Sequence, residues 1–451
     1  MGRLFGTDGV RGKAGDILSP ELSFKLGKVF GSVLKRDIAK PSVLIGKDTR
    51  ISGDMLEAGL VAGLTAMGVD VFLAEVIPTP AIAYLVKKYN TSAGVVISAS
   101  HNPFMDNGIK FFDKDGYKLS DKLEKEIEDI IFNDYDSLKN ETCEHIGKKT
   151  MLNTVDEDYS KYLASCVDNY DFSGIKIAID CANGATFKTA PLVFEKLNAE
   201  IYTIYDKPDG ININENCGST HMKNLVEFVK NNNMDIGVAY DGDGDRCFLV
   251  DELGNVIDGD MIMSICSKHL KQNGKLQKNT LVTTVMSNLG LFIMGEKEGI
   301  NIEKTDVGDR YVLEKLIDIK ANFGGEQSGH IIFLDYNTTG DGILTSLNVI
   351  KIMKETGKKL SELNNVMKVM PQVLVNAKVS AENKKNYVKN DKIRTEIEEL
   401  EKKFGAKGRV LIRPSGTENL VRVMIEGEDE AELLKSATKL KDLMEELLCV
   451  E

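Results

Sequence analysis

Short apolar runs alternate with longer amphipathic stretches along most of this chain. An apolar run at 42–45 is followed by a polar turn and by a helical pattern that ends near Met67. A strand pattern at 69–76, a helix pattern at 81–88 and a third apolar run at 94–97 come next. Apolar runs of this length indicate buried strands, and the longer periodic stretches indicate helices that pack on them.

The same order of elements recurs twice. The second segment begins with a strand pattern at 176–180 and reaches another at 236–240, and the third begins at 281–285. Strands that alternate with helices predict βαβ units and a mainly parallel sheet in each segment. Three unrelated domains could show such runs as well, but a pattern that repeats in order favours one unit used three times.

In each copy a polar, glycine-containing or proline-ended loop follows an apolar strand and leads into another. The loops are residues 98–103, 241–246 and 324–330, and the strands after them are 109–112, 247–250 and 331–334. Such a hairpin tip at the carboxyl end of a sheet is the usual place for ligand chemistry.

The last eighty residues show a different order of predicted elements. Strand patterns at 372–379, 409–412 and 420–425 alternate with a charged helix at about 389–403 and a final helix that ends near Leu448. This order predicts a small α+β domain with an antiparallel sheet.

The loop at 241–246 places three carboxylates two residues apart. Asp241, Asp243 and Asp245 are separated by glycines, which give the backbone the freedom to curl around one cation. Oxygen ligands select a hard ion such as Mg²⁺, Mn²⁺ or Ca²⁺. An EF-hand is rejected because its position 6 would be Arg246 instead of glycine and its flanks are strands. A solvated acidic turn is disfavoured because three such close carboxylates repel one another.

The loop at 98–103 pairs Ser100 with His101 and suggests a hydrolase. No G-x-S-x-G elbow is present, and adjacent side chains on a strand point to opposite faces, so His101 is not obviously a base for Ser100. Alone, the loop favours an Asn-Pro turn. Beside an acidic metal loop, a serine that carries a phosphoryl group would be a natural fourth ligand for Mg²⁺.

Two further loops offer recognition groups. Arg413, Ser415, Gly416 and Thr417 would form a turn whose donors suit a phosphate, although a simple hairpin explains the residues almost as well. In the loop at 324–330, Glu326 and Ser328 could bind sugar hydroxyls, and His330 could act as an acid or a base. Neither a P-loop nor a dinucleotide fingerprint occurs.

Composition narrows the partners. The 451 residues carry a formal net charge of −12, with 42% hydrophobic and 28% charged residues. This disfavours nucleic acid and anionic membranes as partners but is compatible with small anions. The seven scattered cysteines lack C-x-x-C spacing, and residues 1–12 lack the apolar core of a signal peptide, so a cytoplasmic protein is expected.

With these loops in order, the chain resembles the α-D-phosphohexomutase superfamily over its whole length. Residues 5–12 (FGTDGVRG) match its N-terminal motif, and residues 307–312 (VGDRYV) resemble its glucosamine branch. The resemblance implies an α/β protein with three consecutive mixed α/β domains of similar topology and a C-terminal α+β domain, around a central cleft. The expected boundaries and roles are 1–150 for a phosphoserine domain, 151–253 for a metal domain, 254–369 for a sugar domain and 370–451 for a phosphate domain.

The resemblance also implies roles for individual residues. Ser100 would be phosphorylated and would join Asp241, Asp243 and Asp245 around Mg²⁺. Lys110 would transfer protons, and because its ordinary pKa of about 10.4 suits a base poorly, burial or cationic neighbours are expected to lower it. The groups expected around the phosphoserine are Arg11, His101 and Arg246; those expected on the substrate are Glu326, Ser328, His330, Arg413, Ser415, Gly416 and Thr417. One departure is Asn419, where the family usually has proline.

The implied activity is that of an intramolecular phosphotransferase, an isomerase. It would interconvert glucosamine 6-phosphate and glucosamine 1-phosphate through a bound 1,6-bisphosphate and so supply UDP-N-acetylglucosamine and cell-wall precursors. The resemblance suggests a homodimer. A mutase for glucose or mannose phosphates and a non-catalytic sugar-phosphate or Ca²⁺-binding module are the alternatives.

Overall fold

The computed structural model describes residues 4–6, 8–384, 386–405, 408–415 and 419–448. The chain divides into two compact units, one formed by residues 1–285 and 300–365 and the other by 286–299 and 366–451. Within the described residues, no helix combines the length and the apolar composition that crossing a membrane requires.

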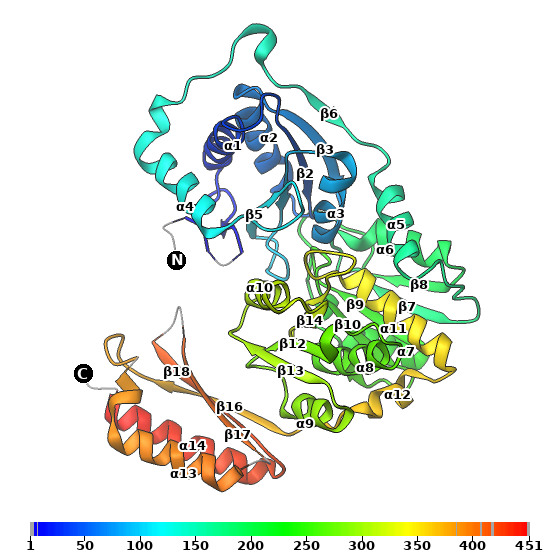
Figure 1. Cartoon of the computed structure of the whole chain (residues 1–451), viewed down its shortest axis with the longest axis vertical. Coiled ribbons are helices and arrows are strands. Elements are labelled where there is room, and N and C mark those ends of the chain that lie inside the picture. The colour runs from blue at the N-terminus through cyan, green and yellow to red at the C-terminus, as the bar shows by residue number, and fades with distance from the viewer. Residues whose placement is uncertain (1–3, 7, 385, 406–407, 416–418, 449–451) are drawn as a thin grey trace. The chain divides into compact units, whose positions relative to one another are not determined.

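The first unit contains three mixed sheets (Figure 1). The six-stranded sheet has, in spatial order, β1 (Val10–Lys13), β5 (Asp106–Asp113), β4 (Ala93–Ile97), β2 (Ser42–Lys47), β3 (Asp70–Val76) and β6 (Lys149–Met151). The five-stranded sheet has β11 (Val256–Ile257), β10 (Cys247–Asp251), β9 (Ile236–Tyr240), β7 (Lys176–Asp180) and β8 (Glu200–Ile204). The four-stranded sheet has β13 (Asn301–Thr305), β12 (Thr280–Thr284), β14 (Phe323–Gly325) and β15 (Ile331–Phe333).

The three sheets share one topology. The orders β5-β4-β2-β3, β10-β9-β7-β8 and β15-β14-β12-β13 are the same when the strands are counted along each segment. In each case the first three strands run parallel and the fourth returns antiparallel as a hairpin. A short loop can join neighbouring strands only if they are antiparallel. The short polar loops therefore make the fourth strand of each segment antiparallel to the third. The predicted fold class, with three similar α/β segments, is confirmed.

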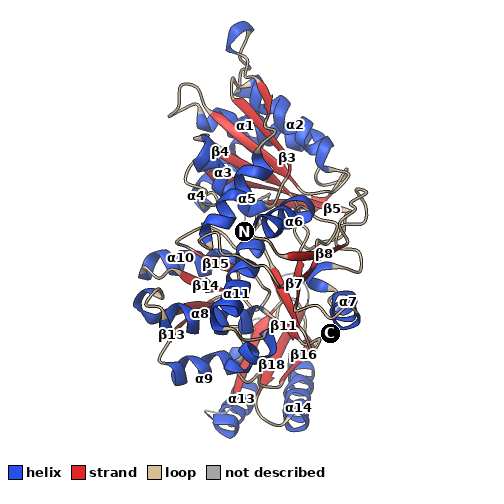
Figure 2. Ribbon diagram, turned by 90° about the vertical axis from the view of Figure 1, so that its right-hand side faces the viewer, coloured by secondary structure: helices blue, strands red, loops and turns tan. Residues whose placement is uncertain are grey.

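Helices cover the sheets (Figure 2). In the first segment they are α1 (Pro20–Leu34), α2 (Gly53–Ala66), α3 (Thr79–Tyr89) and α4 (Asp121–Asp129). In the second they are α5 (Val155–Cys166), α6 (Thr186–Lys196) and α7 (Lys223–Asn231). After these come α8 (Gly259–Gln272), α10 (Asp309–Ile319), α11 (Gly342–Thr356) and the short α12 (Leu360–Leu363).

The strand pattern of the first sheet explains why both of its faces are covered. Val43 and Ile45 belong to the core that includes α1 and α2, whereas alternate positions face the other way. On that other face Gly94 lies against α3, since a Cβ there would be 2.6 Å from the side chain of Val86. Helices α1 and α2 also approach closely, because a Cβ on Gly63 would meet the carbonyl oxygen of Phe24 at 2.2 Å.

The second unit is the α+β tail together with one additional helix. Its antiparallel sheet has the order β16 (Gln372–Lys378), β18 (Leu420–Glu426) and β17 (Arg409–Pro414), with α13 (Asp391–Phe404) and α14 (Glu430–Leu448). The additional helix is α9 (Leu289–Glu298). Asn288, just before it, donates to the carbonyl oxygen of Met370 and accepts from its N–H, each at 2.9 Å.

One buried carboxylate of the second sheet creates a pH-dependent stability. Asp180 ends β7, and its two oxygens accept the N–H groups of Ala182 and Gly218, each at 2.9 Å. Burial raises the pKa of Asp180 to about 7 in spite of these hydrogen bonds. In an unfolded chain an aspartate titrates near about 3.9, so the folded protein binds more protons between these two pH values.

We therefore expect the stability contributed by Asp180 to fall as the pH rises from about 4 to 7, by up to about 4 kcal/mol. Asp180→Asn removes this dependence, so the Tm of the wild type relative to the variant should decrease over that interval. Thermal melts in a pH series measure it. Asp209→Asn, at an exposed loop position of the same segment, is the matched control. A difference between wild type and Asp180→Asn that does not change with pH would contradict the prediction.

Candidate active site

The three polar hairpin loops of the first unit converge on one cavity of about 1020 Å³. The predicted site residues that line it are Arg11, Ser100, His101, Asp245, Arg246, Glu326, Ser328 and His330. Because each loop follows the third strand of its sheet, the repeated topology explains why residues more than two hundred positions apart meet here.

The aspartate loop between β9 and β10 has the geometry of a cation site. Asp241, Asp243 and Asp245 are all buried, and one carboxylate oxygen from each lies within 4.8 Å of the others. The Oδ1 atoms of Asp243 and Asp245 are buried without a hydrogen-bond partner among the described residues. Burial and the two neighbouring carboxylates raise the pKa of Asp241 well above its usual range. Orphaned carboxylate oxygens fit a hard divalent cation.

Ser100 lies directly against this loop. Its hydroxyl donates to Oδ2 of Asp241 at 2.6 Å, and its Oγ lies 3.4 Å from Nδ1 of His101. Ser100 has a φ of +54°, so it is in a left-handed turn beyond the end of β4. The alternation argument that separated Ser100 from His101 was wrong because it applies to extended strands.

Lys110 is held between two carboxylates. Its Nζ lies 3.0 Å from Oδ2 of Asp243 and 3.0 Å from Oδ2 of Asp8, and its side chain is buried. Burial alone lowers the pKa of Lys110, but the two carboxylates outweigh it and raise the pKa above the usual value. The expectation of a lowered pKa was therefore wrong for this arrangement, because the neighbours of Lys110 are anions.

Basic groups lie on the cavity side of Ser100. Arg11 forms an ion pair with Asp8, and its Nε is buried without a hydrogen-bond partner among the described residues. Arg246 donates its backbone N–H to Asp241 at 3.1 Å and places its Nε 3.8 Å from Asp245. Burial, followed by these two guanidinium groups, lowers the pKa of His101 to about 4, so the ring is neutral near pH 7. Two cations and a neutral imidazole suit an incoming phosphate.

The loop between β14 and β15 supplies the opposite wall. Oε1 of Glu326 accepts the N–H of Gly308 at 3.1 Å, and the Oγ of Ser328 is buried without a hydrogen-bond partner within the described part of the chain. His330 is buried, with Nε2 accepting the N–H of Gly340 at 3.0 Å and Nδ1 at 3.4 Å from Asp245. Among the described residues, Ser328 therefore has a free hydroxyl for a ligand and Glu326 lines the cavity beside it, whereas both nitrogens of His330 face protein atoms.

Comparison with known proteins agrees with this geometry. The sequence matches four domain families described as phosphoglucomutase/phosphomannomutase, namely alpha/beta/alpha domain I over residues 2–137, domain II over 157–254, domain III over 258–370 and the C-terminal domain over 374–443. The chain belongs to the phosphoglucomutase/phosphomannomutase family. The resemblance seen in the sequence is confirmed.

Curated relatives and solved structures match over nearly the whole chain. A phosphoglucosamine mutase from Clostridium novyi is 55% identical over 446 residues, and one from Caldicellulosiruptor saccharolyticus is 57% identical over 451; these alignments cover 99% of this chain and 99% and 100% of those proteins. A phosphoglucomutase/phosphomannomutase family protein from Burkholderia thailandensis has a TM-score of 0.81 at 21% identity, covering 98% of this chain and 97% of that one. The parafusin of Paramecium has a TM-score of 0.80 at 15% identity, covering 98% and 95%. These structures establish the fold.

The phosphate-loop residues predicted for this family member lie in the second unit. Arg413 is on β17, and the N–H of Ser415 donates to the carbonyl oxygen of Leu420 at 2.9 Å, which closes a hairpin between β17 and β18. Gly416 and Thr417 lie outside the described residues. Asn419 is described, and its carbonyl oxygen accepts the N–H of Val379 at 3.1 Å.

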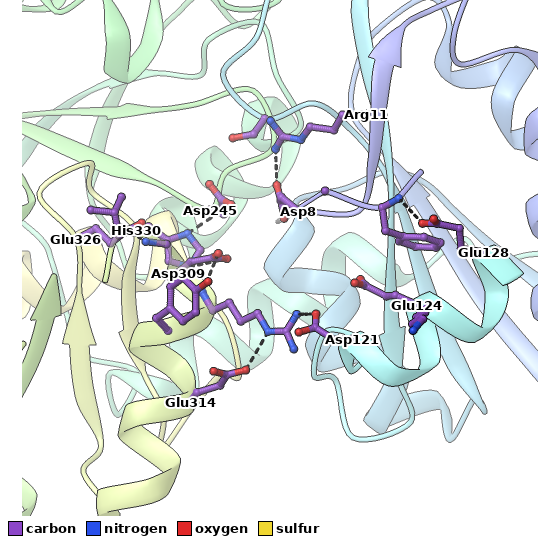
Figure 3. A pocket seen from close by; sticks show the side chains of 18 of the residues that line it. Asp8, Arg11, Asp121, Glu124, Glu128, Asp245, Asp309, Glu314, Glu326 and His330 are labelled. Carbon is purple, nitrogen blue, oxygen red and sulfur yellow. Dashed lines mark hydrogen bonds and ion pairs between the residues drawn. The ribbon is translucent and has the colours of Figure 1, made fainter. Parts of the chain in front are cut away.

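The structure adds site residues of the family fold that the sequence did not reveal. Lys118 joins the first and third segments, with its Nζ 2.6 Å from Asp8 and 2.5 Å from Asp309. Figure 3 shows Asp8 and Arg11 facing Asp309 and His330 across the cavity. Asp8 and Asp309 belong to the two motifs already noticed, but Lys118 is in a hairpin that carries no signal of its own.

Proposed function

We propose that this chain interconverts glucosamine 6-phosphate and glucosamine 1-phosphate, with Ser100 as the phosphoryl carrier. The observation that carries the proposal is the hydroxyl of Ser100 at 2.6 Å from Asp241, inside the three-aspartate cluster. The relatives that are 54–57% identical over the full length bear the name phosphoglucosamine mutase, which supports the choice of substrate.

We infer that Asp241, Asp243 and Asp245 hold Mg²⁺ together with an oxygen on Ser100. Three anionic oxygen donors within 4.8 Å suit this ion, and two of their buried oxygens accept no hydrogen bond among the described residues. When bound, the ion would offset charge on the transferring phosphoryl group.

Individual residues take different parts in the transfer of the phosphoryl group. Phosphorylated Ser100 passes its phosphoryl group to the free hydroxyl of the sugar phosphate, which gives a bisphosphate and frees the serine oxygen. The bisphosphate then reorients in the cavity. Ser100 accepts its other phosphoryl group, and the isomeric sugar monophosphate leaves. Arg11 and Arg246 would hold the phosphoryl oxygens, and His101 would orient them as a neutral donor. Proton transfer by Lys110 remains a prediction from the family resemblance.

Substrate recognition is assigned to the rest of the cavity and to the tail. Glu326 and Ser328 would bind sugar hydroxyls, Ser328 through an Oγ that has no hydrogen-bond partner among the described residues, with His330 beside them. The non-reacting phosphate would bind the tail loop, whose predicted donors are Arg413, Ser415, Gly416 and Thr417. We propose that the functional domains are residues 1–150, 151–253, 254–369 and 370–451, because each contributes one of these loops.

The acidic lining of the cavity supports an amino sugar. Nine carboxylates line the cavity, against the four basic side chains of Arg11, Lys125, Arg246 and Arg310; they are Asp8, Asp121, Glu124, Glu128, Asp129, Asp245, Asp309, Glu314 and Glu326. An ammonium group at the 2-position of the sugar finds a partner in such a wall, and a neutral hydroxyl gains less. Burial raises the pKa of Glu124 to about 7, and an adjacent ammonium would favour its ionised form.

We expect kcat/KM for glucosamine 6-phosphate to exceed that for glucose 6-phosphate by at least about tenfold, since one charge-assisted hydrogen bond is worth about 1.5–3 kcal/mol. A coupled assay with a hexose 1,6-bisphosphate primer measures both substrates, and mannose 6-phosphate completes the series. Equal or reversed values would assign the chain to the glucose or mannose branch and leave the phosphoserine chemistry standing.

Two wider properties complete the proposal. We propose a homodimer, as the family resemblance suggests, and light scattering of the purified protein measures it. A cytoplasmic location is compatible with the free thiols of the six described cysteines.

A further inference from the structure

A buried arginine from another part of the first segment forms several hydrogen bonds to the loop that carries Ser100. Arg50 follows β2, and its side chain is 0% exposed. Its Nη2 donates to the carbonyl oxygens of Ser100 at 2.9 Å and Asn102 at 2.8 Å, and its Nη1 donates to that of Pro103. One planar guanidinium therefore binds three carbonyl groups of a single turn.

The charge of Arg50 is balanced by Asp48, which also reaches the loop. Arg50 donates its Nε to Oδ2 of Asp48 at 2.8 Å. The same carboxylate accepts the hydroxyl of Ser98, and the Oγ of Ser98 in turn accepts the backbone N–H of Ser100 at 2.9 Å. The chain of contacts Arg50–Asp48–Ser98 thus closes on both backbone polar groups of Ser100. We call these three residues the loop clamp.

A second segment of the chain supports the same turn. The amide of Asn214 donates to the carbonyl oxygens of Ser100 at 2.9 Å and Asn102 at 3.1 Å. The carbonyl oxygen of Ser100 thereby receives two donors. Since its N–H is also bonded, only the side-chain oxygen of Ser100 is left for chemistry.

The clamp explains how Ser100 keeps an unfavourable backbone conformation. A serine with φ of +54° persists only where its surroundings impose that conformation. Because the turn is left-handed, the hydroxyl of Ser100 points to Asp241 and not along the direction of β4. A phosphoryl carrier that must attack in line loses about a hundredfold in rate for a displacement of roughly 1 Å.

We propose that Arg50, by its direct bonds to the loop carbonyls, and Asp48, through Ser98, are positioning residues that fix the Ser100 loop for phosphoryl transfer. Arg50 differs in this from Arg11 and Arg246, which line the cavity, because its donors are directed at backbone carbonyls and at Asp48. The inference rests on the proposed role of Ser100 as the carrier.

Two variants and a control test the proposal. Arg50→Lys keeps the positive charge beside Asp48 but cannot reach three carbonyl groups, so kcat should fall by at least about a hundredfold. Ser98→Ala removes only the hydroxyl that joins Asp48 to Ser100, and kcat should fall about tenfold. KM should stay within about twofold in both, since neither residue lines the cavity. Ser23→Ala removes a buried hydroxyl from α1 and should leave kcat unchanged.

The decisive readouts are the single-turnover rate at which a hexose 1,6-bisphosphate phosphorylates Ser100, followed by intact mass, and amide hydrogen exchange of residues 98–105. Both variants should slow phosphorylation in proportion to kcat and should speed exchange of the loop, while Ser23→Ala changes neither. Wild-type phosphorylation rates in folded Ser98→Ala would overturn the proposal, whether or not Arg50→Lys folds. Turnover that survives in Ser100→Ala would instead refute the proposed function, and the exchange data would still show whether the clamp holds the loop.

Discussion

Ser100→Ala is expected to lose at least about a hundredfold in mutase turnover, because a covalent relay has no second path once its carrier is removed. The hydroxyl of Ser100 is the group that donates to Asp241. The other serine of the loop, Ser98, donates its hydroxyl to Asp48 and accepts the N–H of Ser100, so it is not placed to act as the carrier. The fold should persist, since alanine removes one oxygen and leaves the backbone contacts of Ser100 intact.

Intact mass measures the carrier directly. Incubation with a hexose 1,6-bisphosphate should add one phosphate to the wild type and none to Ser100→Ala. Ser165→Ala, at an exposed position of α5, should behave as the wild type. If Ser100→Ala keeps more than about a hundredth of the wild-type rate while folded, Ser100 is not the carrier.

The architecture could be predicted because it is encoded locally. Strand patterns such as those at 176–180 and 236–240 coincide with β7 and β9, and each polar loop is a hairpin tip as expected. Helix α9 is different. Its sequence continues the third segment, but it belongs to the unit formed with the tail, and only the packing around Asn288 and Met370 reveals this.

The electrostatic environment of the site could be predicted only in part. The spacing of the three aspartates predicts that they act together. The two carboxylates beside Lys110 are distant in sequence, at Asp8 and at Asp243, and Asp243 is 133 positions away. From the sequence, burial suggested a lowered pKa for Lys110, but long-range carboxylates reverse the sign. The role of Arg50 could not be predicted either, because its partners in the Ser100 loop lie about fifty positions away. A charged residue in a polar turn normally suggests solvent, and nothing local indicates that the turn is buried against the Ser100 loop.

Asp243→Asn is expected to weaken Mg²⁺ binding and to lower turnover by at least about a hundredfold. A catalytic metal supplies several kcal/mol of charge stabilisation, and each 1.36 kcal/mol corresponds to about tenfold in rate. Asn keeps the size of the side chain and one acceptor oxygen, so the contacts of Oδ2 with Thr79 at 2.7 Å and Lys110 at 3.0 Å can persist. What the variant lacks is an anionic ligand.

Metal affinity separates this role from a structural one. Titration of the protein with Mn²⁺, followed by electron paramagnetic resonance, should show a weaker Kd for Asp243→Asn without reference to activity. Thr79→Val is the matched control, because it removes the hydroxyl that donates to the same carboxylate and leaves every charge in place. It should bind Mn²⁺ nearly as the wild type does. Unchanged Mn²⁺ affinity in Asp243→Asn, or turnover that a chelator does not reduce, would contradict a metal site at this loop, since three buried carboxylates would then be neutralised by protein cations alone.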